Sequence, residues 1–588
     1  MSEVHPRPTV RRDRYASLDG AWGFVFDDAD AGIAAGWFRD VDVFDRTITV
    51  PFAPESPDSG IGDTGFHPVA WYRREFGAEE LDAAGRGPQG DRVLLHFGAA
   101  DHRADVWVDG THVGHHVGGQ TAFSFDITDA LVGDAHVVVV RVLDDPHDAA
   151  LPRGKQDWQL TPHSIWYHRI TGIWRSVWLE AVPSVHITHL AWTPDITRAA
   201  VRLELELNSR PAAPLVVSVD LALGDERLAL IDIEVGSDRL YVDVPIAALR
   251  NGQGADSLLW SPDRPRLVDA AVRLSTGDVV ASYLGLRSVR VDGGRLLLNE
   301  RPFDMRSVLQ QGYWPTSHYT PPSVGAMREE VELTKRLGFN SIRIHQKVED
   351  PRFLYWCDVL GLAVWAEAAA AYEFSPRAVE LYSAEWVAIV RAQQSHPSIM
   401  VWVPFNESWG IQQVSHEPSQ AAYSRALADL TRALDPSRPV IANDGWEHTG
   451  SDLTTIHDYS ADGDVLRERY ATVASITDLL QGVGPHGRPM AAPGSRPLAP
   501  PVMVTEFGGV RFEHGATHEN GWGYSEAPDG AAFEHRLTAV IGAIRSSPHV
   551  VGFCYTQLTD TEQEVNGLCD ANRVPKLPEE TIRRIVAG

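Results

Sequence analysis

Short runs of alternating apolar and polar residues fill the first 184 positions of the chain, and Gly, Pro and Asp separate them. Alternation of this kind, interrupted by turn residues at short spacing, predicts an all-β sandwich. Asp109-Gly110 follows one such run and predicts a hairpin across residues 104–114. The expected strands lie at 72–76, 93–97, 104–108, 137–142 and 176–179.

The alternating pattern continues over residues 185–288. This length of roughly 100 residues is typical of an immunoglobulin-like sandwich. We therefore expect a second β-sandwich domain in the middle of the chain. Its strands are expected at 186–192, 200–207, 215–221 and 240–244.

From residue 289 onward, strand-like apolar runs alternate with helical patterns. Eight such units in roughly 290 residues predict a (β/α)₈ barrel, or TIM barrel, a fold of typically about 250 residues. The chain should then have three domains, at 1–184, 185–288 and 289–588, with the Pro-rich stretch 484–501 as a loop before the seventh strand. The barrel strands are expected at 303–308, 340–345, 362–366, 399–404, 439–443, 454–457, 502–505 and 550–555, and helices at 324–337, 376–394 and 421–434.

Composition excludes several classes of protein. The net charge of −27 argues against nucleic acid or an anionic membrane as a partner, because both require a positive surface. Three cysteines are too few for a disulfide framework or a Cys-based zinc cluster. No run of about 20 apolar residues could span a membrane, and the N-terminus has no apolar signal segment. We expect a cytoplasmic protein, although a secreted one with its leader removed would share this pattern.

Two glutamates end predicted barrel strands, which is where the chemistry of such barrels takes place. Glu407 ends the fourth strand and Glu506 the seventh, roughly 100 residues later, or about three units of the barrel. Two carboxyl groups that flank a glycosidic bond can cleave it, one as proton donor and the other as nucleophile. The alternative is a pair of solvated or salt-bridged strand-end glutamates without a catalytic role.

Several motifs resemble glycoside hydrolase family 2, the group that includes β-galactosidases, β-glucuronidases and β-mannosidases. Residues 18–22 (Leu-Asp-Gly-Ala-Trp) and 165–180 resemble its jelly-roll sugar-binding domain, and the middle region resembles its immunoglobulin-like domain. Residues 338–347, 405–410 (Phe-Asn-Glu-Ser-Trp-Gly) and 505–509 (Thr-Glu-Phe-Gly-Gly) resemble its barrel motifs. The resemblance covers essentially the whole chain and implies a jelly roll, an immunoglobulin-like domain and a catalytic TIM barrel.

The resemblance also implies roles for individual residues. Glu407 would be the acid/base, Glu506 the nucleophile, and Asn406 the residue that holds the sugar 2-OH. Arg343 matches an arginine that orients the nucleophile, and His345 would point inward with it because alternate strand residues share a face.

Further polar and aromatic residues at strand ends could contact the substrate, or could instead pack around the site. They are Glu367, Trp409, Asp444, Trp446, His457, Tyr459, Tyr555 and Gln557.

Neither a cofactor nor a metal is expected. The third strand ends in Trp-Ala-Glu-Ala-Ala and lacks the Glu/His set of the large metal-dependent β-galactosidases. The carbohydrate substrate is the expected partner, and the oligomeric state cannot be read from the sequence, although a homo-oligomer is compatible with the resemblance.

The identity of the sugar is less determined. β-Glucuronidases carry an Asn-x-Lys motif for the uronate carboxylate, whereas Asn566 is followed here by Leu568 at the lysine position. A buried carboxylate without a cation is costly, which disfavours a β-glucuronidase. We expect a retaining exo-β-glycosidase acting on a terminal β-galactosyl unit, with galactofuranosyl and arabinosyl units as open variants and a β-glucuronidase of the same family as an alternative. A carbohydrate-binding protein without catalysis and a transglycosylase are the other readings.

Overall fold

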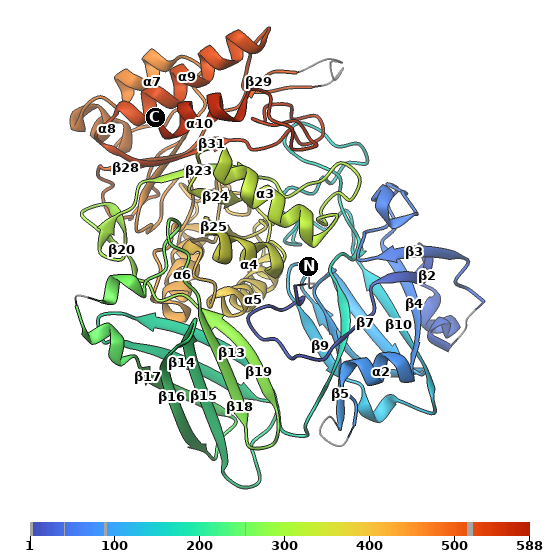
Figure 1. Ribbon diagram of the computed structural model, residues 1–588. Coiled ribbons are helices and arrows are strands. Elements are labelled where there is room, and N and C mark those ends of the chain that lie inside the picture. Colours follow the sequence, from blue (N-terminus) through green and yellow to red (C-terminus); the bar gives the residue numbers. More distant parts are fainter. Residues whose placement is uncertain (1–3, 40–41, 88–90, 253, 514–520) are drawn as a thin grey trace.

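The computed structural model describes residues 4–39, 42–87, 91–252, 254–513 and 521–588 (Figure 1). The N-terminal alternating runs form two antiparallel sheets, with strand orders β1-β12-β5-β9 and β3-β2-β4-β10-β7-β8. Alternate residues of both sheets, such as Leu95, Val138 and Val140, meet in one buried core, as predicted for a sandwich. The strands are β1 (Ala16–Ser17), β2 (Gly20–Phe26), β3 (Arg46–Val50), β4 (Val69–Gly77), β5 (Arg92–Phe97), β7 (Arg103–Val108), β8 (Thr111–Val117), β9 (Phe123–Asp126), β10 (Ala135–Leu143) and β12 (Val177–Val182).

The predicted hairpin is formed by β7 and β8, which pair antiparallel with Val108 opposite Thr111. Asp109 and Gly110 lie between them with φ of 49° and 75°. Two consecutive residues with positive φ form the type of turn that matches the twist of a hairpin, which is why Asp-Gly predicts it.

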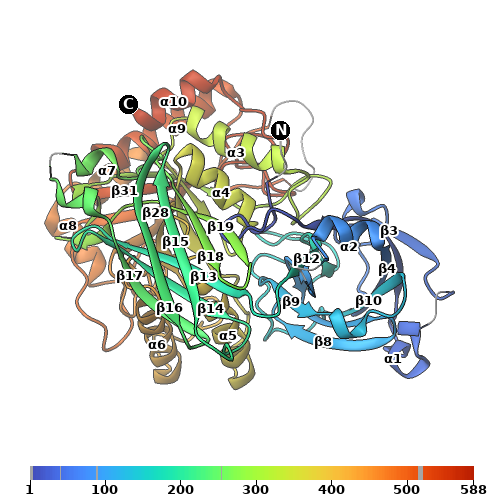
Figure 2. The ribbon, with the colours of Figure 1, turned by 60° about the horizontal axis from the view of Figure 1, so that its bottom comes forward.

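The middle region forms a second antiparallel sandwich, with strand orders β13-β14-β17 and β16-β15-β18-β19. Its core contains Val201, Leu203 and Leu205 from one sheet and Val217 and Val219 from the other. Both views show this sandwich and the N-terminal one against different sides of the barrel (Figures 1 and 2). The strands are β13 (Ile187–Asp195), β14 (Ala200–Leu207), β15 (Leu215–Leu223), β16 (Glu226–Val235), β17 (Arg239–Pro245), β18 (Val268–Leu274) and β19 (Val279–Leu284).

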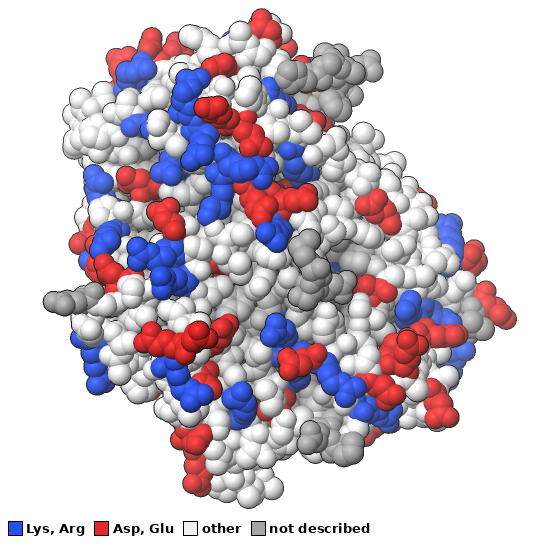
Figure 3. All heavy atoms as spheres, in the orientation of Figure 1, with Lys and Arg blue, Asp and Glu red and all other residues white. Residues whose placement is uncertain are grey.

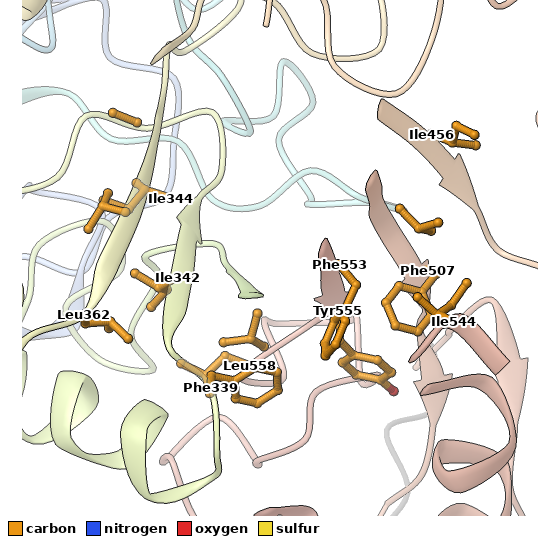
Figure 4. Packing of buried hydrophobic residues seen from close by; sticks show 14 of the residues in the cluster. Phe339, Ile342, Ile344, Leu362, Ile456, Phe507, Ile544, Phe553, Tyr555 and Leu558 are labelled. Carbon is orange, nitrogen blue, oxygen red and sulfur yellow. The ribbon is translucent and has the colours of Figure 1, made fainter. Parts of the chain in front are cut away.

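The C-terminal region forms the barrel, in which seven parallel strands follow the order β26-β25-β24-β23-β31-β28-β27. Helices between the strands cover its outside, and apolar side chains such as Ile342, Phe507 and Ile544 pack between the two layers (Figure 4). The strands are β23 (Met305–Gln310), β24 (Ser341–Ile344), β25 (Ala363–Glu367), β26 (Ile399–Val403), β27 (Thr454–Asp458), β28 (Val502–Gly508) and β31 (Val550–Thr556). The helices are α3 (Val324–Arg336), α4 (Pro351–Leu360), α5 (Pro376–Gln393), α6 (Pro418–Leu434), α7 (Gly463–Arg469), α8 (Val473–Leu480), α9 (Gly530–Ser546) and α10 (Glu579–Ala587).

The segment predicted as the fifth strand, 439–443, is not a regular strand. Its backbone pairs with the end of β26 only through two bridges, from Trp402 to Val440 and from Asn406 to Asp444. On its other edge, the amides of Val440 and Ala442 donate to the side chains of Asp452 and Ser451 rather than to β27. Side-chain acceptors replace the strand ladder here, so the segment closes the barrel without becoming a strand.

A long segment between β10 and β11 (Gly172–Ile173) extends from the N-terminal sandwich to the mouth of the barrel, and we call residues 144–171 the interdomain loop. The amide of Gly154 donates to Ala370 O at 3.0 Å. Trp522 and Gln563 both donate to Ser164 O, at 2.7 and 2.9 Å. The loop is therefore tied to the barrel segments that follow β25, β28 and β31. The exact domain boundaries at 184 and 288 stay predictions.

On the face shown in Figure 3, acidic and basic side chains are interspersed although the net charge is −27. Within the described ranges, no helix is long and apolar enough to cross a membrane.

Candidate active site

The structure brings Glu407 and Glu506 together at the barrel mouth. A carboxylate oxygen of each lies within 4.8 Å of the other and of an imidazole nitrogen of His457. Glu506 belongs to β28 and is 4% exposed, whereas the side chain of Glu407, beyond the end of β26, is 14% exposed. A pair of this kind, one buried and one reaching the solvent, could face a bound ligand from two sides.

The backbone at Glu407 forms a tight turn. It is supported by residues at the end of the segment that was predicted as the fifth barrel strand. Glu407 and Ser408 both have positive φ, 49° and 57°. The amide of Glu407 donates to Asp444 O at 3.1 Å, and that of Ser408 donates to Asn443 Oδ1 at 2.9 Å. These contacts hold an unfavourable backbone conformation that residues other than Gly adopt mainly where the surroundings impose it.

Arg343 lies beneath the carboxylate pair and is fully buried. Its guanidinium lies 3.0 Å from Glu506 Oε1, 2.8 Å from Glu367 Oε2 and 2.9 Å from Asp444 Oδ2. It also donates to Asn406 Oδ1 at 2.6 Å. Because the five N–H groups of arginine are arranged in one rigid plane, Arg343 fixes the positions of these four side chains relative to one another.

His457 connects the two glutamates. Its Nδ1 lies 2.7 Å from Glu407 Oε1 and 3.5 Å from Glu506 Oε2, and its Nε2 lies 3.2 Å from Asp444 Oδ2. Burial alone would lower the pKa of His457, but the charge of Glu506 and the hydrogen bonds to Asp444 and Glu407 raise it to about 10. The imidazole is therefore a cation at neutral pH. Burial would raise the pKa of Asp444, but Arg343 and His457 together hold it below its ordinary value.

We expect His457→Asn to make the free energy of unfolding less dependent on pH. The pKa of His457 is about 10 in the folded state against an ordinary 6.5. The stabilisation from this group is therefore complete below pH 6.5 and is lost as the pH rises through about 10. Its contribution falls by about 1.4 kcal/mol per pH unit in this window.

Urea titrations of both proteins between about pH 6 and pH 10 measure this difference in slope. His535→Asn, which changes an exposed histidine of α9, is the control. Parallel curves for the wild type and His457→Asn would contradict a charged His457.

Tyr459 binds the second oxygen of Glu506. Its hydroxyl donates to Glu506 Oε2 at 2.6 Å, while Arg343 faces Oε1. The ring of Tyr459 stacks on Tyr524 with centroids 3.4 Å apart. Oε2 of Glu506 thus accepts a hydrogen bond from Tyr459, whereas Oε1 is ion-paired with Arg343 and accepts no hydrogen bond from the described residues. The two contacts orient the carboxylate before any ligand binds.

Three further residues that were predicted for the site, His345, Glu367 and Asn406, also lie beside Arg343. His345 Nδ1 lies 3.1 Å from Glu367 Oε1, and burial lowers the pKa of His345 well below its ordinary range, so the ring is neutral. Asn406 Nδ2 is buried and has no hydrogen-bond partner within the described part of the chain. A buried donor without a partner is costly, so this amide is available for a ligand.

Trp409 and Trp446 contact different aromatic partners. Trp409 contacts Trp166 of the interdomain loop and Tyr372, with ring centroids at 5.6 and 5.5 Å. Trp446 stacks on His486 at 5.0 Å. Trp409 thus belongs to an aromatic wall next to Glu407 that two domains build, as expected of a surface on which a sugar or aglycone stacks.

Two predicted residues have side-chain partners other than the carboxylate pair. Tyr555 is fully buried in the apolar layer between strands and helices, beside Phe507 and Phe553 (Figure 4). Successive strand residues face opposite sides, and it is Thr556 of β31 that lies within 3.2 Å of the Tyr459 hydroxyl. The expected position of Tyr555 at the site is thereby corrected. Gln557 bonds Gln311 and Asn566, each at 2.8 Å, and supports the loop after β31.

The sequence reasoning missed the contribution of the interdomain loop. Lys155 is 5% exposed, and its charge interacts with the carboxylates of Glu564, Glu407, Glu506 and Glu367. Nothing in residues 153–157 (Arg-Gly-Lys-Gln-Asp) marks this lysine as part of a barrel site, since it belongs to the preceding domain. The Gly154-Lys155 pair at the end of a β-sandwich is only a weak signal that the lysine approaches the active site of another domain.

Among the residues that the structure describes, two groups of His and Glu side chains have donor atoms close enough to bind one metal ion. They are Glu407, His457 and Glu506, and His168, His318 and Glu562, each set within 4.8 Å. In the first, a protonated His457 already donates to the carboxylates, which does not fit a metal ligand because metal-bound imidazole must be neutral. The second lies at the interdomain loop, and the expected independence of metal stays a prediction.

Comparison with known proteins identifies two domains of this chain. Residues 15–183 match the family model "Glycosyl hydrolases family 2, sugar binding domain", and residues 289–475 match "Glycosyl hydrolases family 2, TIM barrel domain". Together these matches cover about three fifths of the chain.

Similar proteins of known name agree with these matches. A β-galactosidase of Thermoanaerobacter pseudethanolicus is 24% identical over 442 residues, which are 72% of this chain and 53% of that protein. The chain spans about half the length of the curated relatives it matches.

Two solved structures have the same overall fold. A β-galacturonidase from Eisenbergiella tayi bound to galacturonate superposes with a TM-score of 0.73 at 21% identity, covering 100% of this chain and 99% of that one. A β-glucuronidase from Ruminococcus gnavus with D-glucuronic acid superposes with a TM-score of 0.75 at 17% identity, covering 98% and 99%.

Proposed function

Since the chain belongs to glycosyl hydrolases family 2, we propose that it is a retaining exo-β-glycosidase that acts through a covalent glycosyl-enzyme. One observation carries the proposal: carboxylate oxygens of Glu407 and Glu506 lie within 4.8 Å of each other at the barrel mouth. Retaining glycosidases hold their two carboxyl groups about 5–5.5 Å apart, whereas inverting ones leave room for a water molecule at about 6.5–9.5 Å.

In the first step, a Glu506 oxygen attacks the anomeric carbon while Glu407 gives its proton to the glycosidic oxygen, and the bond to the aglycone breaks. Arg343 and Tyr459 hold Glu506 for this attack, with one partner on each oxygen. In the second step, Glu407 takes a proton from water, and the water oxygen displaces Glu506 from the anomeric carbon. Two inversions restore the original configuration.

Asn406 supports both steps. Arg343 holds its Oδ1, which leaves Nδ2 free to donate to the sugar 2-OH. Hydrogen bonds to this hydroxyl strengthen as the oxocarbenium-like transition state forms, so they lower the barrier more than they tighten substrate binding.

The glycone is the finer part of the proposal. The β-galactosyl unit expected from the sequence agrees with the name of the relative from Thermoanaerobacter pseudethanolicus, whereas the two solved structures carry uronic acids. Leu568, which replaces a lysine in the sequence argument against a β-glucuronidase, is fully buried in the apolar core and does not face the site. The argument from Leu568 therefore concerns only the loop after β31. It does not exclude that a basic side chain from another element binds a uronate carboxylate.

We expect the purified protein to release p-nitrophenol from a β-glycoside in the presence of a chelator. The panel holds β-galactopyranoside, β-galactofuranoside, β-glucoside, β-mannoside, β-glucuronide, β-galacturonide and α-arabinosides. Proton NMR should show that the first-formed sugar has the anomeric configuration of the substrate before mutarotation, which is the β-anomer for the β-glycosides. An α-anomer as the first product from a β-glycoside would contradict retention, and loss of activity in the chelator would point to the group of His168, His318 and Glu562. A protein that binds sugars without cleaving any of them would be a carbohydrate-binding protein instead.

A further inference from the structure

The interdomain loop brings the basic side chain of Lys155 close enough to the carboxylate pair for its charge to interact with Glu407 and Glu506. The loop approaches the barrel closely at Gly154, whose φ is 60°, and a Cβ there would lie 2.1 Å from Gln346 O. The amide of Tyr167 donates to Lys155 O at 2.9 Å, and Gly154 bonds Ala370. Backbone contacts on both sides therefore fix Lys155 at the edge of the site.

The ammonium group of Lys155 has no direct partner. Among residues 4–39, 42–87, 91–252, 254–513 and 521–588, no carboxylate oxygen lies within 4.0 Å of Nζ and none accepts a hydrogen bond from it. Lys347, which is also buried, shows the ordinary situation, because it donates to Gly312 O and Tyr319 O and pairs with Glu349 at 3.0 Å. Because the Lys155 side chain is only 5% exposed, water can hydrate its ammonium group only in part, and an anionic ligand would be a favourable partner.

The carboxylates around Lys155 already have other partners, although Oε1 of Glu506 is ion-paired with Arg343 and accepts no hydrogen bond from the described residues. Glu407 contacts His457, and Glu506 contacts Arg343 and Tyr459. The two oxygens of Glu564 accept from Tyr167 and from Asn566.

Glu367 accepts from Arg343 and from the amide of Gln346. The donors of Lys155 thus remain available although four carboxylates lie in its surroundings.

We propose that Lys155 binds the carboxylate of a β-linked uronic acid, so that the enzyme prefers uronides to the corresponding neutral hexosides. This inference rests on the proposed function, because it assigns a substrate class to the same site. A carboxylate fits better than a hydroxyl, since an anion neutralises a buried ammonium and a charge-assisted hydrogen bond is about twice as strong as a neutral one. The cation that the loop after β31 lacks would come from the N-terminal domain.

The test compares matched substrate pairs, galacturonide with galactoside and glucuronide with glucoside, all as p-nitrophenyl β-glycosides. The wild type should have the higher kcat/KM for the uronide of at least one pair. Lys155→Met should lower this preference about 100-fold, mainly through KM, and change the neutral sugars only a few-fold. Lys155→Arg should keep most of the preference, and Lys335→Met, which removes a lysine in α3, is the matched control.

A second readout does not require turnover. Free uronic acid should raise the melting temperature of the wild type and not of Lys155→Gln, whereas the neutral hexose should act equally on both. A wild type without preference for a uronide, or equal losses on both members of each pair in Lys155→Met, would overturn the assignment. Hydrolysis of neutral sugars that depends on Glu506 would then still support the proposed function, whereas no hydrolysis of any substrate would contradict the function itself.

Discussion

Glu506→Ala is expected to reduce turnover of the best substrate by about 10⁵-fold, the largest loss of any single substitution in this protein. Without this carboxylate no covalent intermediate forms, and Arg343 and Tyr459 are left facing an empty space. The measurement is kcat under saturating substrate, with circular dichroism and thermal melting to show that the variant is folded. Glu506→Gln, which keeps the side-chain volume, should lose nearly as much activity.

Chemical rescue distinguishes a lost nucleophile from a damaged site. Azide is small enough to enter the space left by the carboxylate and attacks from the same face, so Glu506→Ala should form the α-glycosyl azide. Glu526→Ala, which changes an exposed glutamate in the segment after β28, should retain wild-type activity. A Glu506→Ala enzyme with more than a tenth of the wild-type rate would show that the nucleophile is another residue.

Glu407→Ala should have an effect that depends on the leaving group. Proton donation matters most when the departing alcohol is a weak acid, so we expect a loss of about 10³- to 10⁴-fold with alkyl glycosides. For nitrophenyl glycosides, which need little protonation, the first step should slow far less. The intermediate should then accumulate, because no general base activates water in the second step.

Azide again reports the role of the residue. In Glu407→Ala it should attack the glycosyl-enzyme from the face opposite Glu506 and form the β-glycosyl azide, the opposite anomer from that of Glu506→Ala. Glu417→Ala, at an exposed position before α6, is the matched control on the same β/α unit. Equal losses for alkyl and nitrophenyl glycosides would contradict a role of Glu407 as proton donor.

The sequence alone predicted the main architecture because it depends on local patterns. Alternation with a period of two predicted both sandwiches. Asp109-Gly110 predicted the β7–β8 hairpin of the N-terminal sandwich from turn chemistry alone. Seven of the eight barrel strands form where apolar runs were expected. Glu407 and Glu506 were predicted to meet because residues at the carboxyl ends of parallel strands gather at one end of a barrel.

Other features depended on contacts between residues far apart in the chain. The segment 439–443 has the apolar composition of a strand, yet the side chains of Ser451 and Asp452 take the place of a neighbouring strand. Tyr555 was placed at the site although it packs in the core, because a predicted strand end does not determine which alternate residues face inward.

Lys155 shows most clearly which contacts cannot be predicted from sequence patterns. Hydrophobic periodicity describes how each domain folds, but it carries no information about where one domain touches another. The aromatic wall and the unpaired ammonium exist because the interdomain loop is held against the barrel by backbone bonds to Ala370 and by the close approach at Gly154. The sequence thus determined the folds and the carboxylate pair, whereas only the tertiary structure decided which charged group of the first domain completes the site.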